Sequence, residues 1–250
     1  MHNGLEISLA AQRIGNLFGL PIPNTLITEW VVMGVLILIA VLAGRKITLI
    51  PGKVQNFFEM LFEYVLEYME KTFESRDLAE KFFPLIMTIF LFVLTSNLFD
   101  FLPIFGSLGF TKQGHFIPLF RPVNTDLNVT LALAIISYVV IEITGITTLG
   151  FLKYASKFVN FKGGVIGFFV GLMELISNTA RLVSFSFRLF GNIFAGEVLI
   201  AIVSLFVPYI LPVPLLMFET FVAVVQAVVF ALLTLIFVKI AITEPHHTHA

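Results

Sequence analysis

Apolar residues form long unbroken runs along this chain. Three runs are well separated and cover about residues 27–44, 82–102 and 127–152. Each approaches the roughly 20 residues with which a helix crosses about 30 Å of hydrocarbon. The pattern therefore predicts three membrane-spanning helices.

Two further apolar segments follow in the C-terminal part of the chain. The first covers about residues 164–210, and the second covers about residues 215–242 after a proline-rich break. A helix over the first segment would be roughly twice as long as the hydrocarbon is thick. We expect this segment to tilt, kink or split, and to form an antiparallel hairpin with the second.

The connection over about residues 52–80 predicts an amphipathic surface helix. Glutamates recur on one helical face, and apolar side chains recur on another. The acidic face suits a protein partner better than anionic lipid headgroups, although a solvated face without a partner explains it equally well. The glutamates are Glu59, Glu63, Glu67, Glu70 and Glu74, and the apolar residues are Phe58, Leu61, Phe62, Val65, Met69 and Phe73.

The composition excludes an ordinary soluble domain. Hydrophobic residues make up 58% of the chain and charged residues 12%, whereas globular domains carry about 25% charged residues. We therefore predict an all-α integral membrane protein, with residues 1–250 forming a single membrane domain and the lipid bilayer as its solvent. The formal net charge of −1 gives no electrostatic footprint for nucleic acid.

No sequence signal indicates a catalytic site, a metal or a cofactor. The chain has no cysteine, which excludes thiolate metal sites, and it carries no phosphate-binding loop, dinucleotide fingerprint or hydrolase triad. His246, His247 and His249 are interpreted as a solvated tail.

Basic residues lie mainly on one side of the predicted spans. Lys and Arg near span ends stay cytoplasmic, so we expect the N-terminus outside and the C-terminus inside. The cytoplasmic set is Arg45, Lys46, Lys53, Lys71, Arg76, Lys81, Lys153, Lys157, Lys162 and Lys239, and the opposite set is Arg13, Lys112 and Arg121.

Several ionisable residues lie within the apolar segments. Each costs roughly 2.5–3.5 kcal/mol at the bilayer centre on insertion scales, which makes it a functional hypothesis. Asp100 lies close to a span end and is interpreted as interfacial. Glu142 is isolated in the third span and has two equal interpretations, a functional role or a hydrogen bond to a neighbouring helix. The others are Glu174, Arg181, Arg188, Glu197 and Glu219.

A polar stripe follows one side of the long fourth segment. Its small members allow another helix to approach closely, and the alternative is packing within the monomer. The stripe consists of Glu174, Asn178, Arg181, Ser184, Arg188, Gly191, Asn192 and Ala195, which share one side at 100° per residue.

Arg188 is a fixed positive charge, because guanidinium stays protonated at biological pH. A buried fixed charge needs a counter-charge. Glu174 lies about 21 Å away along the helix, and Glu197 lies on roughly the opposite face. We therefore predict that another subunit supplies the carboxylate.

The hairpin brings two further polar residues to the level of this stripe. Counted from the proline break, Gln226 falls near Arg188 and Glu219 falls near Glu197, so both glutamates lie on the outer side of the arginine. Glu174 lies on its inner side. Buried carboxyl groups exchange protons near neutral pH, and this order predicts two half-paths for protons, with an electrostatic barrier at Arg188 between them.

One motif carries a resemblance that spans nearly the whole chain. The run from Ser186 to Glu197, SFRLFGNIFAGE, resembles the signature of subunit a of the F-type ATP synthase. The run from Asp126 to Thr130 before the third span and the pair Gln226-Ala227 in the last helix support the resemblance, in family order. The resemblance implies a surface helix and a long, strongly tilted helical hairpin that wraps the rotating c-subunit ring.

The resemblance also implies roles for individual residues. Arg188 is expected to be the arginine that faces the ring carboxylate, with Gln226 beside it. The expected outer half-channel residues are Glu197, Glu219 and Asn192, and the inner ones are Glu174 and Ser184. Some relatives have a histidine at one of the positions of Glu197 and Glu219. The resemblance assigns no role to Arg181.

The expected function is that of a proton-conducting stator subunit without catalytic activity of its own. Its expected partners are the c-subunit ring and the peripheral-stalk b subunits, with the catalytic head of the synthase contacted indirectly. The expected location is a bacterial inner membrane, or alternatively the mitochondrial one. A self-contained ion or solute transporter and a structural scaffold are the alternative interpretations, and the sequence leaves H+ and Na+ open.

Overall fold

The computed structural model describes residues 11–17, 20–45, 48, 51–102, 108–112, 115–158 and 164–243, so the histidine tail lies outside the described residues. The helices are α1 (Asn24–Gly44), α2 (Lys53–Phe73), α3 (Arg76–Phe99), η1 (Val123–Thr125), α4 (Leu127–Leu149), α5 (Phe151–Phe158), α6 (Gly164–Phe206) and α7 (Pro212–Ile242).

Five of these helices, α1, α3, α4, α6 and α7, are long and apolar enough to cross a membrane. The prediction of an all-α membrane fold with five such segments is confirmed. Two short antiparallel hairpins add to it, β1 (Arg13–Leu17) with β2 (Leu20–Pro23) and β3 (Gly109–Lys112) with β4 (His115–Pro118). The sequence analysis did not predict these hairpins, because their strands are too short to show an alternating pattern.

Some helix ends differ from the predicted ranges for local reasons. The expected helix over residues 52–80 ends at Phe73, because Glu74 adopts a left-handed backbone with φ of 58°. Ser75 then caps α3, since its side chain accepts a hydrogen bond from the Leu78 N–H. Helix α4 ends before Gly150, whose φ is +82°, and the short helix α5 follows. Helix α6 ends at Phe206, and α7 begins at Pro212.

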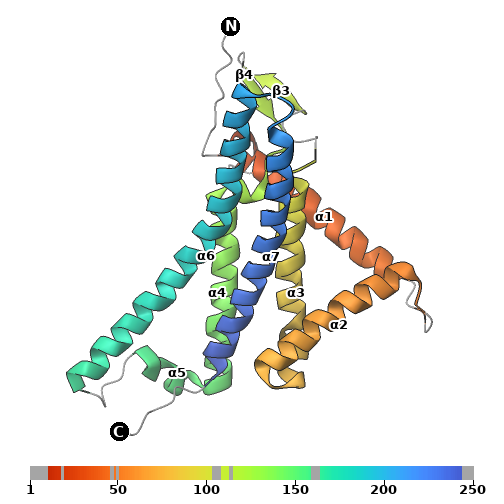
Figure 1. The fold of residues 1–250 in the computed structure, drawn as a ribbon. Helices are drawn as coiled ribbons and strands as arrows, with labels where there is room; N and C mark the ends of the chain where they lie inside the picture. The colour runs from red at the N-terminus through yellow and green to blue at the C-terminus, as the bar shows by residue number, and fades with distance from the viewer. Residues whose placement is uncertain are drawn as a thin grey trace.

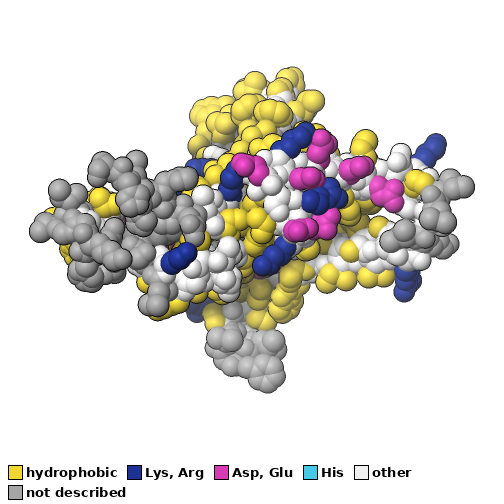
Figure 2. All heavy atoms as spheres, turned by 90° about the horizontal axis from the view of Figure 1, so that it is seen from below, with side chains coloured by type: hydrophobic (Ala, Val, Ile, Leu, Met, Phe, Trp, Pro, Cys, Tyr) yellow, Lys and Arg dark blue, Asp and Glu magenta, His cyan; other side chains and the backbone are white. Residues whose placement is uncertain are grey.

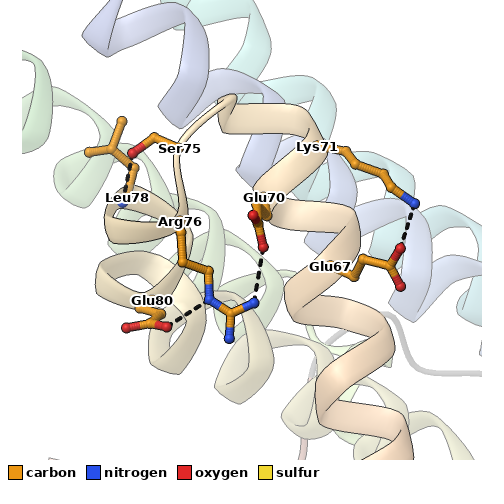
Figure 3. A network of polar contacts seen from close by, with 7 residues as sticks. All are labelled: Glu67, Glu70, Lys71, Ser75, Arg76, Leu78 and Glu80. Carbon is orange, nitrogen blue, oxygen red and sulfur yellow. Dashed lines mark hydrogen bonds and ion pairs between the residues drawn. The ribbon is translucent and has the colours of Figure 1, made fainter.

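Charged side chains hold the connection between α2 and α3. Arg76 bridges the two helices, because its Nη1 lies 3.0 Å from Glu70 in α2 and its Nε lies 2.7 Å from Glu80 in α3. Lys71 pairs with Glu67 one turn away at 2.7 Å. Figure 3 shows these contacts around the turn. Seen from below, acidic and basic side chains gather at this end of the molecule, beside extensive hydrophobic surface (Figure 2).

Helices α3, α4, α6 and α7 form the centre of the molecule, while α1 and α2 lean away from it (Figure 1). Two apolar clusters fill this centre. The lower cluster joins α2, α3, α4 and α7 and includes Phe73, Phe82 and Leu235. The upper cluster joins α3, α4, α6 and α7, where the rings of Phe185 and Phe230 lie 5.0 Å apart.

Helix α6 leaves the bundle and leans outward over its first half (Figure 1). Only 11% of the residues in its most apolar window are buried, against 44% for the neighbouring α7. An apolar helix that exposes most of its surface must be covered by lipid or by another protein. The long fourth segment, which we expected to tilt, kink or split, forms a single helix. It packs against its own chain mainly through its second half.

Buried polar side chains tie the helices together at the upper end, where α3 ends and α4 begins. Asn97 donates through Nδ2 to the Ala223 carbonyl oxygen at 3.1 Å and accepts from the side chain of Asn124 at 2.6 Å. Asp126 caps α4 by accepting from the Asn128 N–H, and it also accepts from the Thr25 hydroxyl of α1 at 2.9 Å. These bonds satisfy groups that would be costly if they were buried without partners.

Replacing Asn97 by alanine is expected to destabilise the protein by about 1–3 kcal/mol, because Asn124 and the Ala223 carbonyl lose a buried partner. Denaturant titration of the protein in detergent micelles measures this loss of unfolding free energy. Thr88→Ala is the matched control in the same helix, since the Thr88 hydroxyl is exposed and bonds only within its own helix, to the Pro84 carbonyl oxygen. Equal stability of the two variants would contradict the role of Asn97.

Candidate functional site: a polar path along α6 and α7

Arg188 lies exposed on the long helix α6. Its guanidinium Nη2 donates to the Ser184 hydroxyl one turn earlier, at 3.4 Å. Among the described residues, no carboxylate lies within ion-pair distance of it. The structure therefore leaves a permanent positive charge on the open side of an apolar helix, with a neutral hydroxyl as its neighbour.

Asn192 and Gln226 join the two helices of the hairpin one turn beyond Arg188. Asn192 donates through Nδ2 to the Gln226 Oε1 at 2.9 Å. Gln226 is buried, and its own amide nitrogen has no partner in the described protein. The contact places Gln226 beside the polar stripe of α6, with a hydrogen-bond donor still to be satisfied.

Glu197 and Glu219 come together farther toward the upper end. Their carboxylates are close enough to repel each other electrostatically. The Glu219 carboxylate lies directly against Gly196, where a β-carbon would overlap it. Gly196 is thus required for this approach, because only glycine leaves the surface of α6 open at that point.

Asp100 and Arg121 also belong to this upper cluster. The Asp100 carboxyl oxygens are buried, and the charges of Glu197 and Glu219 act on Asp100. Arg121 is buried as well, and its positive charge attracts the Glu197 carboxylate. The three carboxyl groups therefore interact electrostatically with one another, and the Arg121 guanidinium interacts with one of them, Glu197.

The sequence analysis did not include either residue in the site. It interpreted Asp100 as interfacial because the residue lies close to the end of a predicted span, and it placed Arg121 among the basic residues on the outer side. The available signal was that Asp100 lies between phenylalanines, at Phe99 and Phe101. Which helices pack against that position becomes visible only in three dimensions.

Buried polar atoms without a protein partner occur near this cluster and along the hairpin. A buried polar atom without a protein partner normally bonds to water. Four such atoms lie in α3, in η1 and along the hairpin, namely Ser96 Oγ, Asn124 Oδ1, Glu197 Oε2 and Gln226 Nε2. The upper region is thus polar enough to admit water between apolar helices.

A separate open cavity lies on the lower side of Arg188, between α6 and α7. Its volume is about 320 Å³. Arg181 stands over the ring of Phe237 in α7, with 5.0 Å from its guanidinium carbon to the ring centroid, a cation–π contact that holds the side chain against the hairpin. The lining residues are Ser177, Ala180, Arg181, Ser184, Phe185, Arg188, Leu233 and Phe237.

Glu174 lies partly exposed on α6, farther toward the lower end. The predicted order of side chains along the path is therefore Glu174, Ser184, Arg188, Asn192 and then Glu197 on one helix. Within the described part of the chain, no group of three or more His, Asp or Glu side chains has the arrangement of a metal site.

Comparison with known proteins identifies the family. The family model described as "ATP synthase A chain" matches residues 26–239. The chain is 31% identical over 219 residues to the ATP synthase subunit a of Moorella thermoacetica, covering 88% of this chain and 90% of the relative. It is 35% identical over 204 residues to that of Campylobacter jejuni subsp. jejuni, covering 80% and 82%.

A third relative extends the similarity over almost the whole chain. The ATP synthase subunit a of Mycobacterium bovis is 32% identical over 250 residues, covering 97% of each protein. Residues 26–239, which the family model matches, include most of each of the five long apolar helices and every side chain of the polar path. The chain therefore belongs to the ATP synthase A chain family.

Proposed function

We propose that this protein is the proton-conducting stator subunit of an F-type ATP synthase, coupling proton flow to rotation of a c-subunit ring. The observation that carries the proposal is Arg188, a fixed charge on the exposed side of α6 without a counter-charge among the described residues. A carboxylate on a passing ring subunit supplies that counter-charge. The ring then covers the open surface of α6.

Protons enter the upper half-channel past Glu197, Glu219 and Asn192 and neutralise a ring carboxylate. After the ring has turned, the proton leaves through the lower half-channel, past Ser184 and Glu174. Arg188 attracts the deprotonated carboxylate and repels a proton that would pass directly between the half-channels. Gln226, held by Asn192, lines the boundary. The separation matters because an open pore would dissipate about 2.3 kcal/mol per charge at 100 mV.

The upper end faces the outside, and the lower end faces the cytoplasm. Lys239, near the end of α7, lies 3.0 Å from Glu74 in the turn between α2 and α3, which puts both segments on the basic side of the bundle. That side is cytoplasmic by the positive-inside rule. The catalytic head and the peripheral-stalk b subunits complete the complex, and this subunit carries out no nucleotide chemistry itself.

Arg188→Ala is expected to abolish ATP-driven proton pumping and to increase the passive proton leak, because the barrier between the half-channels is lost. Dye-reported pumping, ATP hydrolysis and leak are measured on the same inverted membrane vesicles. Arg45→Ala is the control, since Arg45 is exposed and lies after the end of α1. Normal pumping by an assembled Arg188→Ala complex would overturn the proposed function.

Gly196→Ala is expected to slow pumping several-fold without preventing assembly. The added methyl group displaces the Glu219 carboxylate from α6, which a flexible side chain accommodates by changing its rotamer. Gly34→Ala in α1 is the matched control, because a β-carbon there meets no atom within 4 Å. Pumping rates per complex that are equal in both variants would show that the position of Glu219 is unimportant.

A further inference from the structure

Glu142 of α4 has a specific partner in the structure. The hydroxyl of Tyr154, in the short helix α5, donates to the Glu142 Oε2 at 2.8 Å. Tyr154 is buried, with 6% of its surface exposed. The carboxyl group that is isolated in the sequence is therefore one half of a carboxylate–phenol pair at the lower end of the bundle.

Two glycines make this contact possible. Gly150, with φ of +82°, allows the chain to reverse direction between α4 and α5. Gly145, one turn after Glu142, leaves the space in which the Tyr154 ring lies, because a β-carbon at position 145 would overlap the ring. The phenol is thus held by the turn, by the packing of its ring and by its hydrogen bond.

The pair lies beside the proposed lower half-channel. Helix α5 packs against α6 as well as against α4. Burial raises the pKa of Tyr154, and the hydrogen bond to Glu142 and the charges of Glu142, Tyr138 and Glu174 raise it further. Glu142 and Glu174 therefore both act on one phenol from two different helices.

Glu142 and Glu174 both lie toward the lower end of the bundle, which agrees with a place beside the lower half-channel. Glu142 lies about two turns before α4 ends, and Glu174 lies about three turns after α6 begins. Both helix ends are at the lower side of the molecule (Figure 1).

We propose that Glu142 is a second proton-exchanging carboxyl group of the lower half-channel and that the Tyr154 hydroxyl both positions it and passes protons to it. This rests on the proposed function of the chain. A proton arriving from Glu174 through water is taken up at the phenol oxygen while the phenol gives its own proton to Glu142. The phenol is unchanged after each transfer, and the proton has moved from the side of α6 to the carboxyl group on α4.

Anchoring α5 alone does not account for a carboxylate at this position. A neutral acceptor such as glutamine would receive the same hydrogen bond, without the cost of an ionisable group inside an apolar helix. The titratable groups that act on the pair are Tyr138 in α4, which interacts with Glu142, and Glu174 in α6, which acts on Tyr154. Lys153 in α5 is exposed, and Lys239 of the adjacent α7 is paired with Glu74.

The test is the pH dependence of ATP-driven pumping by the whole complex in inverted vesicles, where the medium reaches the cytoplasmic face. Glu142→Gln is expected to slow pumping per complex several-fold and to flatten its dependence on the pH of the medium. Tyr154→Phe keeps the ring over Gly145 and removes only the hydroxyl. It is expected to change the pH profile as well, because the Glu142 carboxyl group loses its hydrogen-bond donor.

Two further variants make the outcome decisive. Tyr209→Phe is the control for the loss of a hydroxyl, because Tyr209 is 87% exposed at the turn of the hairpin. Glu142→Asp keeps the carboxyl group and is expected to restore part of the pH dependence. If pumping by Glu142→Gln and Tyr154→Phe has the wild-type pH profile, with only the yield of complex reduced, the pair is structural and the inference is overturned.

Arg188→Ala, measured in parallel, separates this inference from the proposed function. Loss of pumping in Arg188→Ala together with a wild-type profile in Glu142→Gln would overturn the inference alone. Normal pumping in an assembled Arg188→Ala complex would overturn the proposed function and the inference with it.

Discussion

The constraint on which this molecule depends is the cost of placing a permanent charge in hydrocarbon. Arg188 cannot lose its proton, and the structure gives it only the Ser184 hydroxyl as a partner within the described chain. Such a charge is stable in a membrane only when a second charge or water reaches it. The open face of α6 is therefore the incomplete half of an interface, which the proposed ring of carboxylate-bearing subunits completes.

The rest of the fold holds that incomplete face in position. Helix α7 is the most buried of the five apolar helices, and it braces the second half of α6 through Phe185, Leu189 and Phe230. At the upper end, the bonds of Asn97 and Asp126 fix α3, α4 and α1 around the hairpin. The proposed function needs such a rigid surround, because guanidinium and carboxylate would have to meet at a defined distance each time a ring subunit passes.

The sequence was sufficient to predict the five long apolar helices, because an apolar run of about 20 residues is typical of a membrane-spanning helix. It also ordered Glu174, Arg188 and Glu197 along one helix by simple spacing. It did not predict the short helices η1 and α5. It could not predict contacts that depend on how separate helices pack. Asp100 joins Glu197 and Glu219 only because α3 meets the hairpin, and Glu142 meets Tyr154 only because Gly145 leaves room for a ring. The break at Glu74 was missed because the amphipathic pattern continues through the turn.

Cysteine cross-linking tests the central claim most directly, because the chain has no cysteine of its own. A single cysteine is introduced at Phe187, which is 55% exposed beside Arg188, or at Leu189, which is 0% exposed on the packed side of the same helix. The ring subunit carries a cysteine next to its carboxylate. The account predicts a disulfide with the ring from position 187 and none from position 189. Failure to cross-link from position 187 in an assembled, pumping complex would contradict it.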